Sequence, residues 1–352
     1  MHSRLPVAIT ILTLLGSIAL CATQSAAQSA SPSANTVTTP WGDPDLQGVW
    51  DFRTITPLQR PDELAEKAVL TEEEAAEWKQ NWANEQNRDR RDGAGTNEVA
   101  SDGRTDVARA YNEFWWDRGT DIVSDRRTSL IVDPPDGRIP ALSQEGQRKA
   151  AIREAERREW NATDIDRRGP ADDPEDRGVS ERCILGFNSG PPMMPSAYNN
   201  NVRVVQAPGY VVLLNEMVHN ARIVPLDDRP RLPNDMRQWV GDSRGRWDGT
   251  TLVVDTRNFT DKTRAGRAPG SAENLHLVER FTRVDADTLL YEFTFNDETT
   301  WARPWTAAVP MKRSDDLLFE YSCHEGNYGM TNLLAGARAE ERVDGNTSRQ
   351  AR

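Results

Sequence analysis

The sequence predicts a mainly β fold, in which an antiparallel meander closes into a lipocalin-like barrel and is preceded by helices and long loops. Three observations favour this class. Short apolar runs recur from about residue 200 onward, turn-forming groups such as Asp248-Gly249 separate them, and no helical pattern lies between them. About eight such strands suit a barrel that holds one small ligand.

The start of the chain predicts export. Arg4 precedes the apolar stretch Leu5–Ala22, and Ser25-Ala26-Ala27 fits a small-residue cleavage site. We therefore expect residues 1–27 to be a signal peptide, with an uncleaved membrane anchor as the alternative. Residues 28–40 are rich in Ser, Ala, Thr and Pro and predict a disordered lead-in. The expected location is periplasmic or secreted, with no membrane association after cleavage.

Residues 41–182 predict one strand, helices and loops packed on the barrel. The stretch that ends in Gly48-Val49-Trp50 indicates a turn that enters a short strand. Thr71 and Glu74 form a capping box for a helix over 71–91, which carries Trp78 and Trp82 on one face. A short strand is expected over 128–132, and Ser143 caps a second helix that runs to about residue 160.

Residues 183–345 predict the barrel domain. We expect its strands at 202–206, 210–218, 221–226, 251–259, 275–284, 288–295, 305–311 and 317–323, with a short helix from 331 to about 341. The sheet is expected to begin near residue 200.

Several phrases resemble a widespread group of uncharacterised exported bacterial proteins. They are Asp45–Trp50, Arg127–Arg138, Trp239–Gly249, Ser271–Phe281 and Cys323–Tyr328, and together they span nearly all of the chain after the signal. The resemblance implies export. A more distant likeness to lipocalin-type barrels rests on the strand pattern.

Charge and cysteine content narrow the partners and the compartment. The formal net charge of −12 argues against nucleic acid and against anionic membrane surfaces. After signal cleavage two cysteines remain, Cys183 and Cys323, and an even pair in an oxidising compartment predicts a disulfide. Two separate buried thiols are the alternative.

The histidines are the first candidates for chemistry, because imidazole transfers protons near neutral pH. His219, His276 and His324 all lie within or at the end of predicted strands. Glu279 alternates in step with Leu277 and Phe281, so it points with the apolar face, where a carboxylate suits acid–base work. The alternative for Glu279 is a structural ion pair with Arg222 or Arg244. We predict His219, His324, Glu279 and His276 as catalytic residues.

Polar and aromatic residues near them are the candidates for substrate binding. Arg222 or Arg244 would orient an anionic group, and the remaining candidates are Glu216, Asn215, Trp305 and Tyr328. The tryptophans would line a pocket for a flat or sugar-like ligand, or pack the core. No cofactor is predicted. Three histidines with a carboxylate would also suit Zn²⁺ or Fe²⁺, but no His-x-His or His-Glu-x-x-His spacing occurs.

The function predicted from these features is binding of a small organic molecule in a barrel pocket by an exported protein. We expect a cofactor-independent hydrolase, lyase or isomerase that uses His and Glu as acid and base. A non-catalytic, lipocalin-like ligand binder is the alternative, and a structural envelope protein is a third.

Overall fold

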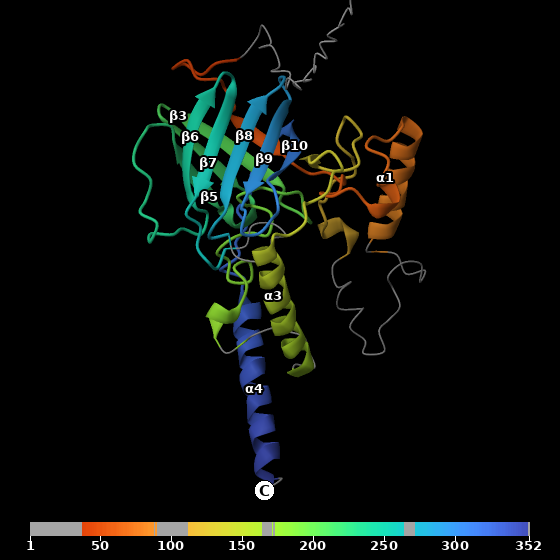
Figure 1. The fold of residues 1–352 in the computed structure, drawn as a ribbon, viewed down its shortest axis with the longest axis vertical. Coiled ribbons are helices and arrows are strands. Elements are labelled where there is room, and N and C mark those ends of the chain that lie inside the picture. Colours follow the sequence, from red (N-terminus) through yellow and green to blue (C-terminus); the bar gives the residue numbers. More distant parts are fainter. Residues whose placement is uncertain are drawn as a thin grey trace, which may run out of the picture. The chain divides into compact units, whose positions relative to one another are not determined.

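The fold is a ten-stranded antiparallel sheet with helices outside it (Figure 1). The computed structural model describes residues 37–87, 89, 112–163, 171, 173–263 and 272–350, all of which belong to the unit 35–352. The predicted signal peptide and most of the lead-in lie outside the described residues. The strands are β1 (Gly48–Asp51), β2 (Ile131–Asp133), β3 (Asn201–Ala207), β4 (Tyr210–Asn215), β5 (Ala221–Pro225), β6 (Asp242–Asp248), β7 (Thr251–Arg257), β8 (His276–Arg283), β9 (Thr288–Asn296) and β10 (Trp305–Ser314).

The helices are α1 (Glu72–Gln86), α3 (Gln144–Thr163) and α4 (Tyr328–Gln350), with short 3-10 helices η1 (Asp62–Leu64), η2 (Glu113–Trp115), η3 (Pro174–Asp176) and η4 (Met217–His219). In the part of the chain that is described, no helix has both the length and the apolar character that a bilayer crossing requires. The predicted capping box is confirmed at α1, where Thr71 Oγ1 accepts from Glu74 N at 3.2 Å. Ser143 likewise accepts from Gly146 N at the start of α3. The C-terminal helix starts earlier and runs further than expected.

The strand order is β5-β4-β3-β1-β10-β9-β8-β7-β6, and β2 pairs with β10 beside this path. Figure 1 shows β6 to β10 side by side. The hairpin predicted at Asp248-Gly249 is confirmed between β6 and β7, and Gly249 adopts a φ of 59°. However, β1 lies in the middle of the sheet, so the expectation that the sheet begins near residue 200 is wrong.

The sheet rolls up but does not close into the predicted barrel. Its edge strands are β5 and β6, and no hydrogen-bonded ladder joins them among the described residues. Side chains meet there instead: a Cβ on Gly245 of β6 would lie 2.9 Å from Val224 Cγ1 of β5. β5 ends at Pro225, whose nitrogen cannot donate a hydrogen bond. A chain of 16 connecting residues (226–241), rather than a tight turn, then leads to β6.

The interior of the rolled sheet is filled by large side chains. Alternation along β8 and β9 turns every second residue inward, as the burial of Leu277, Phe281, Phe293 and Phe295 shows. The rings touch: Phe295 stacks on Trp305 with centroids 4.4 Å apart. A ligand inside the sheet would therefore have to displace tightly packed aromatic side chains.

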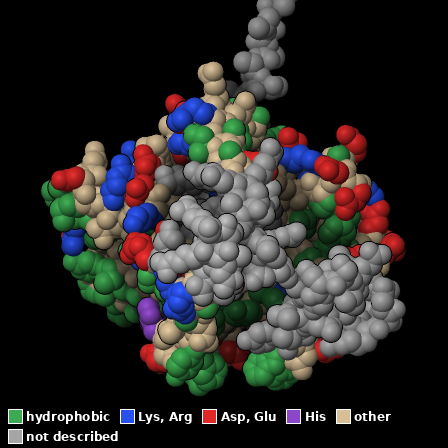
Figure 2. Space-filling view, turned by 90° about the horizontal axis from the view of Figure 1, so that it is seen from below, with side chains coloured by type: hydrophobic (Ala, Val, Ile, Leu, Met, Phe, Trp, Pro, Cys, Tyr) green, Lys and Arg blue, Asp and Glu red, His purple; other side chains and the backbone are tan. Residues whose placement is uncertain are grey.

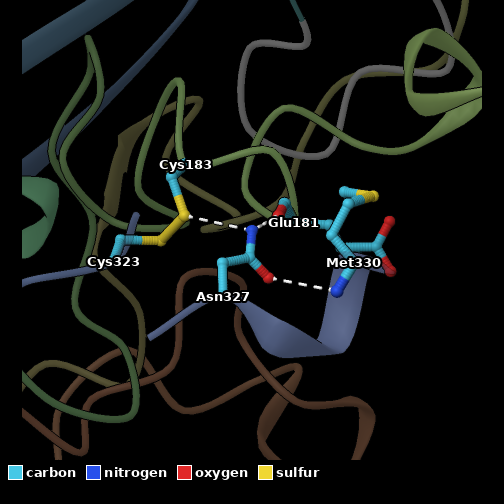
Figure 3. The surroundings of a disulfide bond; sticks show 5 residues. All are labelled: Glu181, Cys183, Cys323, Asn327 and Met330. Carbon is cyan, nitrogen blue, oxygen red and sulfur yellow. Dashed lines mark hydrogen bonds between the residues drawn. A yellow bond between two sulfur atoms is a disulfide. The ribbon is translucent and has the colours of Figure 1, made fainter. Parts of the chain in front are cut away.

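The predicted strand over 317–323 is wrong, because these residues form coil and turn. The disulfide prediction is confirmed: Cys183 and Cys323 are bonded, with Cα atoms 5.7 Å apart. Figure 3 shows that the bond is tied to the start of α4. The Asn327 amide donates to Glu181 O at 2.8 Å and to Cys183 Sγ at 3.5 Å, while its Oδ1 accepts from Met330 N. The disulfide therefore fastens the C-terminal helix to the 181–183 turn.

Replacing both cysteines by serine should lower the free energy of unfolding by about 4–5 kcal/mol, because the bond closes a loop of 140 residues in the unfolded chain. Urea denaturation of the double variant and of the oxidised protein measures the difference. Thiol titration of the unfolded, unreduced protein is the control and should find no reactive Cys183 or Cys323. Reactive thiols there, or equal stabilities, would contradict the assignment.

Candidate functional site

Glu279 lies at the centre of a buried polar cluster. It is fully buried on β8, and Arg222 on β5 reaches it with both terminal guanidinium nitrogens, Nη2 at 2.9 Å from Oε1. Tyr291 on β9 donates its hydroxyl hydrogen to Oε1 at 2.7 Å and accepts from Met193 N at 3.1 Å. The structural ion pair named above as the alternative is therefore formed, and with Arg222.

The surroundings favour a charged Arg222 and a neutral Tyr291 in this buried cluster. Burial opposes the charge of Arg222, yet the neighbouring Glu279 carboxylate outweighs it and raises the pKa of Arg222. Burial, and then Glu279, raise the pKa of Tyr291 well above its ordinary value, so the phenol stays neutral. Both carboxylate oxygens are engaged by protein donors and none of the three side chains is more than 5 % exposed. The geometry gives the predicted acid–base role of Glu279 no support.

Arg244 does not join this cluster. Arg244 lies opposite Asp255 in the β6–β7 pair. Val254, which directly precedes Asp255 on β7, lies opposite Glu279 in the β7–β8 pair. Alternation therefore places Arg244 on the outer face of the sheet. There its guanidinium contacts Asp242 and donates to Pro230 O at 2.7 Å. Arg222 and Arg244, the two alternatives for orienting an anionic group, therefore lie on opposite faces of the sheet.

His276 begins β8 on the outer face, where its ring contacts the Asp255 carboxylate. Arg231 and Arg257 contact the same carboxylate. Partial burial disfavours ionisation of Asp255, but the hydrogen bond with His276 and the nearby positive charges outweigh it and lower the pKa of Asp255. Arg231 also donates to Asp242 O at 2.8 Å. This cluster thus ties the β5–β6 connection to β6 and β7.

The other two histidines lie outside strands, which corrects the prediction. β4 ends at Asn215, and His219 is an exposed residue of η4 that follows Val218, whose φ is 59°. His324 is exposed in the turn before α4. Their chain neighbours Val218 and Cys323 belong to the same small apolar cluster, so these two histidines flank one region and His276 another.

The remaining predicted residues are also dispersed. Asn215 and Glu216 are buried, and Glu216 accepts from Asn201 Nδ2 at 2.8 Å. Trp305 is buried in the hydrophobic core, whereas Tyr328 is exposed at the start of α4. Within the described residues, no group of three His, Cys, Asp or Glu side chains is placed to share a metal ion.

A groove that the sequence analysis did not identify lies beside α1. We call it the α1 groove; it has a volume of about 530 Å³. Its lining consists of Asp51, Arg53, Lys79, Trp82, Ala83, Gln86, Asn87, Glu113, Trp116, Asp117, Arg118, Gly119, Thr120, Asp121 and Lys312. Trp50 and Met311 point into the core, so alternation turns Asp51 and Lys312 outward and places the groove outside the sheet.

Ion pairs order the lining of the groove. Arg53 bonds both Asp51 and Asp117, and the Asp51 bond is the main cause of the raised pKa of Arg53. Lys79 Nζ lies 3.2 Å from Asp121, and the Arg118 guanidinium covers the ring of Trp116 at 4.2 Å. A second hollow of about 480 Å³ is lined by Trp78, Leu64, Leu70 and Asn81, and by five charged residues, Glu63, Glu66, Lys67, Glu74 and Glu77.

Glu279→Gln should destabilise the fold by about 3–5 kcal/mol, because it leaves Arg222 charged and unpaired in the core. Glu292→Gln on neighbouring β9, where the side chain faces outward, is the control and should cost no more than about 0.5 kcal/mol. Urea denaturation measures both. The double change Arg222→Met with Glu279→Met should recover most of the loss. Equal costs for the two single variants would refute a structural role for the pair.

Asp255 should stabilise the fold at neutral pH and lose that effect in acid. Its folded pKa is lowered, so the stabilisation is present above the unfolded pKa and disappears as the pH falls through the folded pKa. The stability difference between wild type and Asp255→Asn should therefore shrink as the pH is lowered from 7 to the acid limit of folding. Asp248→Asn, which removes an exposed ion pair, should show little difference at any pH. A constant Asp255→Asn difference would contradict the assignment.

Comparison with known proteins adds little beyond this geometry. No protein-family model and no curated protein matches the chain. Among solved structures, the chain is similar to a secretary abundant heat soluble (SAHS) protein from Ramazzottius varieornatus, at 13 % identity and a TM-score of 0.22. The match covers 32 % of this chain and 70 % of that one.

Proposed function

We propose that this protein is an exported, non-catalytic binder of a small organic molecule, and that the ligand lies in the α1 groove. The observation that carries the proposal is the groove itself. Its volume of about 530 Å³ falls within the range of small-molecule sites, which is roughly 300–1,000 Å³. Two half-buried tryptophans, Trp82 and Trp116, offer ring surface beside ordered polar groups.

Binding has more support than catalysis. Glu279 is sealed in the core, His276 contacts Asp255 on the outer face, and His219 and His324 lie exposed at a third position. A hydrolase, lyase or isomerase needs an acid or base within reach of one bound substrate. That hypothesis and the resemblance to the exported bacterial group stay predictions. The disulfide supports a periplasmic or secreted location, because such bonds persist in oxidising compartments.

The ionic order of the groove also supports binding. Arg53, Lys79 and Arg118 each contact a carboxylate of the same lining, which restricts these side chains before a ligand arrives. Side chains that are already ordered lose less conformational entropy on binding. The groove is therefore suited to recognise a ligand without rearranging.

Trp82→Ala should weaken ligand binding roughly tenfold, because a lost aromatic contact costs on the order of 1 kcal/mol. Trp78→Ala is the matched control. It lies one turn earlier on the same helix but lines the other hollow, so it should bind as wild type does. Calorimetric titration with hits from a small-molecule stability screen measures the affinities, and circular dichroism verifies the fold. Hits that bind both variants equally well would place the ligand elsewhere.

A further inference from the structure

The charges of the α1 groove balance, which restricts the class of ligand. Among the described residues, its lining holds four cationic side chains, Arg53, Lys79, Arg118 and Lys312, and four anionic ones, Asp51, Glu113, Asp117 and Asp121. Lys312 also lies opposite Asp51 in the β1–β10 register, a cross-strand pair of opposite charge. The described lining of the groove therefore offers no surplus of either sign to an organic anion or cation.

Its polar atoms favour a ligand that both donates and accepts hydrogen bonds. Guanidinium and ammonium groups donate, and the adjoining carboxylates accept, as at Arg53 with Asp117 and at Lys79 with Asp121. The Gln86 side-chain amide and the Thr120 hydroxyl do both. Neighbouring hydroxyl groups on one ligand match such alternating donors and acceptors, whereas a purely apolar ligand would leave them unsatisfied.

Aromatic rings continue beyond the groove. Trp116 in the lining meets Tyr198 edge-on with centroids 6.2 Å apart, and Tyr198 meets Phe187 at 5.3 Å. Phe187 is 43 % exposed although it is a large apolar residue. Tyr198 also stacks on Tyr321 beside the disulfide. Ring surface thus extends out of the groove, farther than a single small molecule in the groove would use.

We infer that the α1 groove binds a neutral oligosaccharide, whose chain leaves the groove along Trp116, Tyr198 and Phe187. This inference rests on the proposed function. A sugar ring presents an apolar C–H face to an aromatic ring and hydroxyl groups around its edge, which is the combination that Trp82 and the paired charges accommodate. Figure 2 shows both acidic and basic side chains on the face that it views.

The test is calorimetric titration of the purified protein with neutral glucan, xylan, mannan and chitin oligomers, each from disaccharide to hexasaccharide. For at least one series, the hexasaccharide should bind at least tenfold more tightly than the disaccharide. Added salt should change these affinities less than twofold, because the ligand carries no charge to be screened. Parallel titrations use oligogalacturonate as an anion, chitosan oligomers as cations, and aryl carboxylates and aryl ammonium ions as compounds other than sugars.

Variants locate the binding site and the direction in which the oligosaccharide leaves the groove. Trp82→Ala should weaken binding of both lengths at least tenfold, whereas Phe187→Ala should remove the advantage of the hexasaccharide and leave the disaccharide affinity unchanged. Trp78→Ala should change neither.

The possible failures are distinct. If charged or aryl compounds bind in a Trp82-dependent manner and no neutral oligosaccharide does, the saccharide inference falls and the proposed binding function stands. If oligosaccharides bind equally well to wild type, Trp82→Ala and Phe187→Ala, the assignment to this groove is overturned. If no compound of any class binds, both proposals fall.

Discussion

The rolled shape of the sheet depends on one buried ion pair, Arg222 with Glu279. Arg222 lies on β5, at one edge of the sheet, and Glu279 lies on β8, six positions away in the strand order. The pair can form only if the sheet curls until β5 faces β8 across the interior. A register slip of one residue on β8 would turn Glu279 to the outer face and leave Arg222 charged in the core, at a cost of several kcal/mol. The pair therefore favours one curvature and one register.

This arrangement explains why binding is proposed outside the sheet. The edge strands β5 and β6 meet through side chains and not through backbone hydrogen bonds, so the rolled sheet depends on a packed interior. Large buried side chains fill that interior, among them Trp50, Tyr291, Phe293 and Trp305. The N-terminal region supplies the ligand-binding surface that the filled interior of the sheet does not offer. It places α1 and residues 112–121 against the outer side of β1 and β10, where Asp51 and Lys312 point outward. The same region provides β1, so one segment both completes the sheet and forms the groove.

Local pattern was enough to predict the Asp248-Gly249 hairpin, the two helix caps and the disulfide, since each depends on residues near in sequence or on the cysteine count. Prediction from local pattern failed where pairing between segments distant in sequence determines the structure. Leu317, Phe319 and Tyr321 alternate as a strand would, but they cannot pair with β10, because β1 and β9 already occupy its two sides. For the α1 groove, the pair Trp78 and Trp82 was visible on one helix face. Nothing local indicated that Arg53 and Lys312 would line the same groove as Trp82, because the tertiary arrangement brings them together.

Two of the residues that suggested catalysis, Glu279 and His276, have a structural use instead, which is to secure the open seam between β5 and β6. An exposed strand edge invites pairing with other chains and has to be covered or blunted. Arg231 and Arg244 hold the β5–β6 connection to the outer face through Asp255, Asp242 and Pro230 O, and His276 completes the Asp255 cluster. Arg222 and Glu279 hold the inner face. Titratable groups gather at this seam because backbone hydrogen bonds do not close it, so their abundance there is a consequence of topology.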